Sequence, residues 1–223
     1  MHQRKSKKVL FYFFLLTIIS SITNTSLNNF NFDKEINIKV SGLSNPNNQI
    51  ILEELKSLNL KGIFLINKKE IIDLIDKNSL VEKYEVAKLY PSTIEIKVYK
   101  TKLLAKINNN GKIFFIGSNG KLILNNIEKK NLPFIFGKPK INEFLKFKTI
   151  IDQSKLSYNQ IENIYYFPSK RWDLKLKDNI LLKLPNEFTK NSLDNAYEFI
   201  KNYKLNKFTV VDFRVNNQII VYE

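Results

Sequence analysis

Few side chains of this chain could carry out covalent or metal chemistry. It contains no cysteine, and its one histidine, His2, lies at an end that we do not expect to be ordered. The composition therefore excludes cysteine nucleophiles, thiolate zinc sites, iron–sulfur clusters and serine–histidine catalysis.

The carboxylates and glycines do not form the pattern of an active site either. The six glycines are dispersed, without the spacing of a phosphate-binding loop. The clustered carboxylates all fall on predicted helices beside lysines, which is typical of a solvated helix face. They are Glu53, Glu54, Glu70, Asp73 and Asp76. We predict a protein without enzymatic activity, cofactor, metal ion or small-molecule substrate.

The charge of the chain suggests nucleic acid or an anionic membrane surface as a partner, but the composition weakens this interpretation. The net charge is +15, and only Arg4, Arg171 and Arg214 of the 36 basic residues are arginine. Lysine, asparagine and isoleucine all have A/T-rich codons, so the lysine excess is typical of an A/T-rich genome. The lysines do not interleave with aromatic residues as they do in single-strand binders. We therefore predict no nucleic-acid partner.

The N-terminal segment has the features of an export signal. Four basic residues within 4–8 precede an apolar run from Val9 to Ile22, and no charge follows until Asp33. The strongly apolar part, 9–19, is shorter than the roughly 20 residues that cross a hydrocarbon core. A cleaved signal peptide, with a cleavage site at 21–23, and an uncleaved anchor are equally compatible with this segment. In both cases the positive-inside rule places everything after Asp33 across the membrane.

The first block after this segment predicts a small α+β module. Residues 34–40 alternate apolar and polar side chains, as a half-buried strand does. Asn45 and Pro46 predict the N-cap and first residue of a helix, and Asn67 with Glu70 predicts the start of a second. Strands are predicted at 81–89 and 93–99. The order strand, helix, helix, strand, strand suggests a module of the POTRA type.

The second block predicts a mixed β domain with helices. Three short strands at 103–107, 112–116 and 121–124 are separated by the turns NNNG (108–111) and GSNG (117–120). A loop carrying Pro133, Gly137 and Pro139 follows. Trp172 heads an alternating strand and is predicted to lie in the core. The remaining elements are predicted as follows: a helix at 142–153, strands at 161–167, 171–177 and 180–184, a helix at 190–203, and strands at 208–214 and 218–222.

The chain resembles the FtsQ/DivIB family of bacterial division proteins in a series of short signatures in the family's order. They are INIKVSG (36–42), LYPSTIEIKVYKTKLLAKI (89–107), FFIGSNGKLI (114–123), LPFIFGK (132–138), RWDLKLKDNILLKLP (171–185) and VVDFRVNNQIIVY (210–222). Each signature is weak alone, but six in register behind a basic and apolar N-terminus make a strong joint signal.

The resemblance implies the domain organisation of that family. We expect a cytoplasmic tail at 1–8, a transmembrane anchor at 9–27, a linker at 28–33, a POTRA (βααββ) domain at 34–100 and a mixed, mostly antiparallel β domain at 101–223. The junction at Lys100 to Leu103 is a candidate hinge between the last two. The implied function is a non-enzymatic, single-pass inner-membrane scaffold at the division septum. Three alternatives are another POTRA-type protein of envelope assembly, a cleaved periplasmic binding protein and a basic surface-binding protein.

The final strand is the predicted partner surface. Residues 218–223 end the sequence, so the residues alone are equally compatible with an outer strand edge that is open to strand addition and with a terminal strand that is capped by a loop. The resemblance implies that membrane-anchored division proteins of the FtsB/FtsL type bind at this last hairpin, and that other division proteins bind the POTRA domain. By position, the implied contact residues are Arg214, Val215, Asn217, Ile219 and Val221, with Arg214 pairing an acidic residue of the partner.

Overall fold

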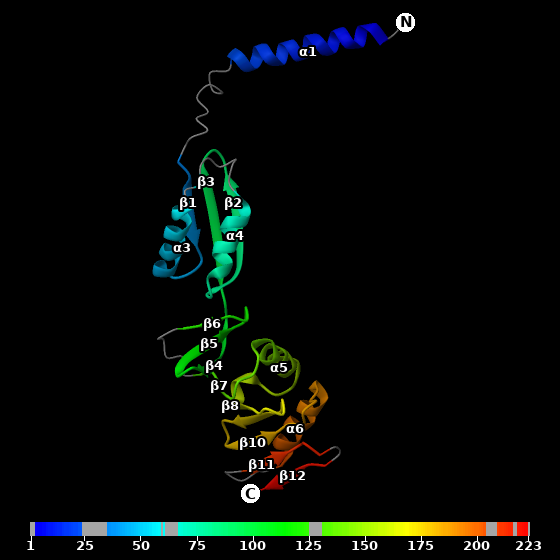
Figure 1. Cartoon of the computed structure of the whole chain (residues 1–223). Helices are drawn as coiled ribbons and strands as arrows, with labels where there is room; N and C mark the ends of the chain where they lie inside the picture. Colours follow the sequence, from blue (N-terminus) through cyan, green and yellow to red (C-terminus); the bar gives the residue numbers. More distant parts are fainter. Residues whose placement is uncertain are drawn as a thin grey trace. The chain divides into compact units, whose positions relative to one another are not determined.

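The computed structural model describes residues 3–23, 35–58, 60, 67–124, 131–203, 209–215 and 218–222. The chain divides into two compact units, one of Met1–Ile72 with Glu85–Lys97 and the other of Asp73–Tyr84 with Val98–Glu223. Figure 1 shows the elements in sequence colours. A helix, α1 (Gln3–Thr23), comes first.

The block that contains the three-stranded sheet has the predicted βααββ order. The elements of this block are β1 (Asn37–Ser41), α3 (Asn45–Ser57), α4 (Lys68–Lys77), β2 (Val81–Leu89) and β3 (Thr93–Lys100). The strands lie in the order β1, β3, β2, and β1 runs parallel to β3 with Ile38 opposite Ile94. Ile51 and Leu55 of α3 are fully buried, as the helical spacing of the apolar residues predicts.

The second sheet has nine strands. In chain order its elements are β4 (Leu103–Asn109), β5 (Lys112–Gly117), β6 (Leu122–Ile123), β7 (Phe134–Phe136), α5 (Ile141–Gln153), the 3₁₀ turn η1 (Tyr158–Gln160), β8 (Ile161–Tyr166), β9 (Trp172–Leu176), β10 (Ile180–Lys183), α6 (Lys190–Asn202), β11 (Thr209–Asp212) and β12 (Ile220–Tyr222). The strand order is β12-β11-β10-β9-β8-β7-β4-β5-β6. Five of the eight strand pairs are antiparallel and three are parallel. The predicted α+β fold, with a POTRA-type module before a mixed and mostly antiparallel sheet, is confirmed.

Helices α5 and α6 bury one face of this sheet. Phe144, Phe147 and Ile151 of α5 and Leu193 and Ala196 of α6 belong to one core with the inward side chains of the strands. Trp172 of β9 is 5% exposed and stacks on Phe147 with ring centroids 4.3 Å apart, so its predicted place in the core is confirmed.

Two local predictions were wrong. The loop predicted around Pro133 and Gly137 contains β7, a central strand that runs parallel to both β4 and β8. Three residues are too few for a periodic pattern, and the neighbours on both sides come from distant segments. The N-cap of α3 is Ser44 and not Asn45, which is already helical.

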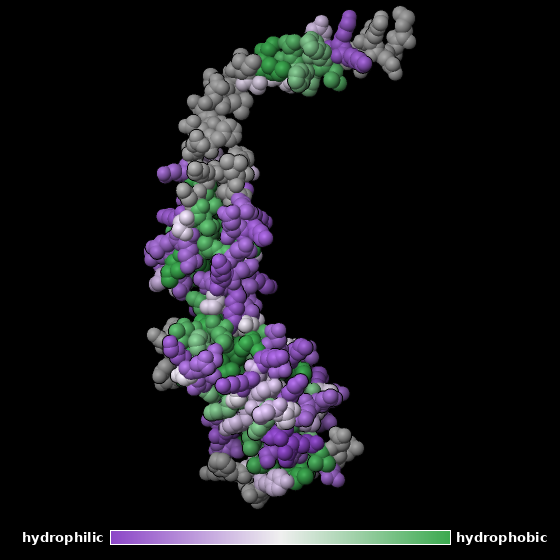
Figure 2. All heavy atoms as spheres, in the orientation of Figure 1, coloured by the Kyte–Doolittle hydropathy of each residue, from purple (hydrophilic) through white to green (hydrophobic). Residues whose placement is uncertain are grey.

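The apolar side chains of α1 are exposed. Leu10 is 71% exposed and Phe13 69% exposed, and Figure 2 shows hydrophobic residues along the visible side of this helix. Within the described residues, none of the helices has both the length and the apolar character needed to cross a membrane.

Candidate functional site

The strand β12 forms one end of the nine-stranded sheet. It pairs antiparallel with β11, with Val221 opposite Val211 and Ile220 opposite Asp212. In the part of the chain that is described, β11 is its one neighbouring strand. Its outer side is therefore an edge of backbone N–H and C=O groups.

Four of the five predicted contact residues gather at the hairpin that β11 and β12 form. Val215 is 46% exposed, Ile219 42% and Val221 39%. The Gln218 amide donates a hydrogen bond of 3.3 Å to the Val215 carbonyl, which holds the two arms together. The fifth residue, Asn217, and the turn predicted at 216–217 lie outside the described residues.

Arg214 already has a partner within the chain. Its Nε donates to Asp212 Oδ1 at 2.8 Å and its Nη2 donates to Asp212 Oδ2 at 2.5 Å. Asp212 is 2% exposed, and the hydrogen bonds from Arg214 lower the pKa of this carboxyl despite its burial. The Arg214 side chain is still 41% exposed, so a further group can approach it.

A row of charged side chains crosses the sheet next to Arg214. Lys183 of β10 lies opposite both Asp173 of β9 and Asp212 of β11, and residues opposite one another in a sheet share a face. Asp173 is 3% exposed and accepts a hydrogen bond of 3.0 Å from Arg171 Nε. Burial raises the pKa of Asp173, because this pair is more loosely bonded than Arg214 with Asp212. We name Asp173, Lys183 and Asp212 the charged row.

The opposite, helix side of the hairpin is aromatic and apolar. Phe199 of α6 stacks on Tyr203 at 4.4 Å between ring centroids and meets Phe213 edge-on at 6.2 Å. Tyr203 is 60% exposed. Val221 shares this side, because it lies opposite the buried Val211. On the other face, β12 itself carries Ile220, opposite Asp212, and Tyr222, whose ring centroid lies 5.8 Å from Lys183 Nζ. The edge strand is therefore apolar on both faces, and the charged row lies behind it on one of them.

Sequence reasoning predicts one part of these flanks and misses the rest. The spacing of Asp212 and Arg214 within one strand places both on one face and predicts an ion pair, which is confirmed. Arg171 and Asp173 have the mirrored spacing, which was a usable signal for the second ion pair. The position of Lys183 between them depends on the register of three strands that are far apart in the sequence. The packing of Phe199 against Phe213 depends likewise on where α6 lies.

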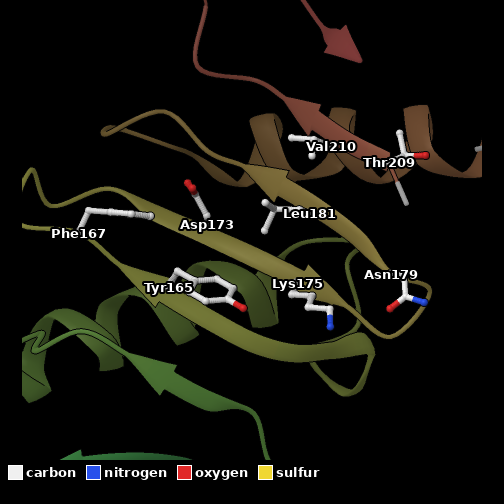
Figure 3. Close-up of a pocket in the computed structure, with 8 residues that line it drawn as sticks. All are labelled: Tyr165, Phe167, Asp173, Lys175, Asn179, Leu181, Thr209 and Val210. Carbon is white, nitrogen blue, oxygen red and sulfur yellow. The ribbon is translucent and has the colours of Figure 1, made fainter. Parts of the chain in front are cut away.

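A pocket of about 480 Å³ lies on the charged face of the sheet (Figure 3). Figure 3 shows its side chains on β8 to β11, on the segment after β8 (Phe167) and in the turn before β10 (Asn179), with α6 behind the strands. It is lined by Tyr165, Phe167, Asp173, Lys175, Asn179, Leu181, Thr209 and Val210. Asp173 is bonded to Arg171, and Lys175 pairs with Glu162 at 3.1 Å. The pocket therefore offers apolar contact between charges that already have partners.

Metal ligands do not gather in the described residues. No group of three histidine, cysteine, aspartate or glutamate side chains there could hold a metal ion.

Two family models match the chain. The FtsQ-type POTRA domain matches residues 36–100, and the C-terminal region of cell division protein FtsQ/DivIB matches residues 99–214, which is more than half of the 223 residues. Among solved structures, the chain is similar to the major extracytoplasmic domain of the trans isomer of the cell division protein DivIB from Geobacillus stearothermophilus. The identity is 12% and the TM-score 0.35, over 46% of this chain and 90% of that chain. No curated protein matches the chain.

Proposed function

The chain belongs to the FtsQ/DivIB family of bacterial cell division proteins, and we propose that it is a scaffold of the division machinery that recruits and connects membrane-anchored division proteins at the septum. The family match over residues 36–214 carries this proposal. The family is non-enzymatic and acts in division at the septum. A scaffold needs binding surfaces rather than reactive groups, which agrees with the side chains available at the sheet edge.

The proposed topology is a single pass through the inner membrane, with the N-terminus in the cytoplasm and the bulk of the chain in the periplasm. Lys7 and Lys8 precede the exposed apolar side chains of α1, in agreement with the positive-inside rule. The intact mass of the protein from the membrane fraction tests this topology. We expect an uncleaved chain, and a mature chain that starts after residue 20 would contradict the anchor.

We place the main partner surface at β12, where a partner of the FtsB/FtsL type adds a strand. Backbone groups on the outer side of an edge strand give such a complex its affinity. Alternate side chains of the added strand then meet different surfaces, because successive residues of a strand face opposite sides. Its side chains on one face would lie beside Val221, and those on the other beside Ile220 and Tyr222, which share the face of Asp212.

This arrangement defines the chemistry of the added strand. Apolar residues are expected on its helix side, where Val221 and Tyr203 are 39% and 60% exposed. Acidic residues are expected on the other side, where the exposed part of the Arg214 side chain can donate hydrogen bonds to a second carboxylate besides that of Asp212. Other division proteins are proposed to bind the POTRA-type module.

Septal localisation and partner capture test the proposed function. A fluorescent fusion of the full chain should gather at the septum of dividing cells, and a pull-down from membrane extracts should recover other membrane-anchored division proteins. A protein spread evenly around the envelope that captures none of them would not be a division scaffold.

A further inference from the structure

The turn between β5 and β6 contacts a segment far from it in sequence. Residues 117–121 form this turn, and residues 76–82 form the corner where α4 ends and β2 begins. Both segments belong to the second compact unit. Sequence reasoning identified 117–120 as a turn that connects two strands, a role that does not require contacts with a distant corner.

Glu82 joins the corner to both ends of the β4–β5 hairpin. Its Oε2 atom accepts a hydrogen bond of 2.7 Å from Thr101 Oγ1 and another of 2.7 Å from Ser118 Oγ. Thr101 is 3% exposed, and its amide donates to the Leu80 carbonyl at 2.9 Å. Hydrogen bonds to an ionised carboxylate are stronger than those between neutral groups.

Asn119 holds the corner from the turn. Its Nδ2 donates to the carbonyl of Ser79 at 3.0 Å and to that of Val81 at 2.9 Å. Its Oδ1 accepts from the Lys121 amide at 3.0 Å, which fixes the shape of the turn.

The Lys121 ammonium completes the contact at the end of α4. It donates to the carbonyl of Asp76 and, at 3.3 Å, to that of Asn78. The last carbonyls of a helix lack partners within the helix, and a cation is favourable at this end.

The fit of the turn requires a glycine at position 117. A Cβ atom there would lie 2.5 Å from Asn119 Oδ1 and 2.9 Å from Thr101 Oγ1, both closer than non-bonded atoms approach. Asn119 and Thr101 are themselves parts of the contact, so any larger residue would displace them.

We propose that the turn 117–121 is a latch that closes on the corner 76–82 and locks the junction Lys100–Leu103, so that this junction bends only when the latch opens. The hydrogen bonds reach the junction directly at Thr101 and at Lys102, whose amide donates to Ser118 Oγ at 3.0 Å and whose carbonyl accepts from the Ser118 amide at 2.8 Å. If the junction were a freely bending hinge, the backbone N–H and C=O groups of Thr101 and Lys102 would form hydrogen bonds with water instead. The latch is a feature additional to the proposed scaffold function, and its residues are separate from the partner-binding edge at β12.

Trypsin tests the latch, because Lys100 and Lys102 lie within the junction. Cleavage of a transiently opened site follows the population of the open form. In the purified full chain we expect Glu82→Ala to speed cleavage at these lysines by about tenfold or more, since hydrogen bonds to a charged group are lost. Glu82→Gln keeps a hydrogen-bond acceptor, so its cleavage rate at these lysines should lie between that of the unchanged protein and that of Glu82→Ala. Glu95→Ala is the matched control, because Glu95 is an exposed strand residue of β3.

A second pair of variants disrupts the latch on the side of the turn. Asn119→Ala removes the hydrogen bonds to the corner, and Gly117→Ala displaces Asn119 and Thr101 by steric clash. Both variants should therefore be cleaved faster at the junction. Cleavage at Lys146 in α5 measures global unfolding in the same samples. The proposal is overturned if Glu82→Ala and Asn119→Ala are both cut at the junction at the rate of the unchanged protein. It is equally overturned if cleavage at Lys146 rises as much as cleavage at the junction.

Discussion

Asp212 and Asp173 show how two buried carboxylates on one face of a sheet can differ. Arg214 reaches Asp212 with bonds of 2.5 to 2.9 Å and lowers the pKa of that carboxyl, whereas burial dominates at Asp173 and raises its pKa. The folded protein therefore favours the charged form of Asp212.

The pH dependence of stability tests this assignment with Asp212→Asn. Because the folded pKa of Asp212 lies below the unfolded value of about 3.9, its stabilisation is complete above that pH and is lost as the pH falls through the folded pKa. At pH 7 we expect the variant to lose about 1–2 kcal/mol in the free energy of unfolding, since solvent screens the partly exposed Arg214. The loss should shrink below pH 4. Asp178→Asn, in the exposed turn after β9, is the matched control. If Asp212→Asn loses no more stability at pH 7 than Asp178→Asn does, the assignment is contradicted.

Gly137 is required by space as well as by its backbone angle. Its φ is +101°, and a Cβ atom would lie 2.2 Å from the Tyr166 carbonyl oxygen. Gly111 has a φ of +80° with nothing within 4 Å, so it serves as the matched control. Gly111→Ala should cost about 1 kcal/mol of unfolding free energy from backbone strain alone, and Gly137→Ala at least about 2 kcal/mol more. If the two variants lose the same free energy of unfolding in chemical denaturation, the close approach of position 137 to the Tyr166 carbonyl oxygen does not contribute.

At the scale of elements, α5 is held on the sheet by aromatic packing. Phe147 is 2% exposed, stacks on Trp172 and meets Phe188 edge-on at 5.4 Å. Phe147→Ala should therefore lower the free energy of unfolding by about 3–5 kcal/mol. Phe136→Ala removes the same atoms from a side chain that is 45% exposed and should cost markedly less. Similar losses for the two variants in denaturant would contradict the assigned packing.

The elements that could be predicted from the sequence are those with a local pattern. The helices α5 and α6 and the strands β2 and β3 carry apolar residues at regular spacing, so their positions were predicted to within a few residues. The strand β7 could not be predicted, because Phe134 to Phe136 form a strand only where β4 and β8 supply hydrogen-bond partners. The same limit applies to the charged row, which exists only in the register of β9, β10 and β11.

At the scale of the whole molecule, chain order predicted where the candidate site would lie but not its surroundings. The last strand was expected at an edge, and β12 ends the nine-stranded sheet in the described part of the chain. Which side chains flank that edge follows from the packing of α6 and from strand register. These flanks are what give the proposed partner strand its alternating character, with Val221 on one face and Arg214 on the other.

Partner capture by edge variants of the full chain tests the central claim most directly. Ile219 precedes β12 at one edge of the sheet, and Leu124 follows β6 at the other, with exposed fractions of 42% and 60%. Proline at either position removes a backbone donor, so the two substitutions are matched. In membrane extracts with a co-expressed partner of the FtsB type, Ile219→Pro should weaken capture at least about tenfold, which corresponds to about 1.4 kcal/mol, while Leu124→Pro leaves it unchanged. If the Ile219→Pro protein is folded and still captures its partner with unchanged affinity, β12 is not the partner-binding edge.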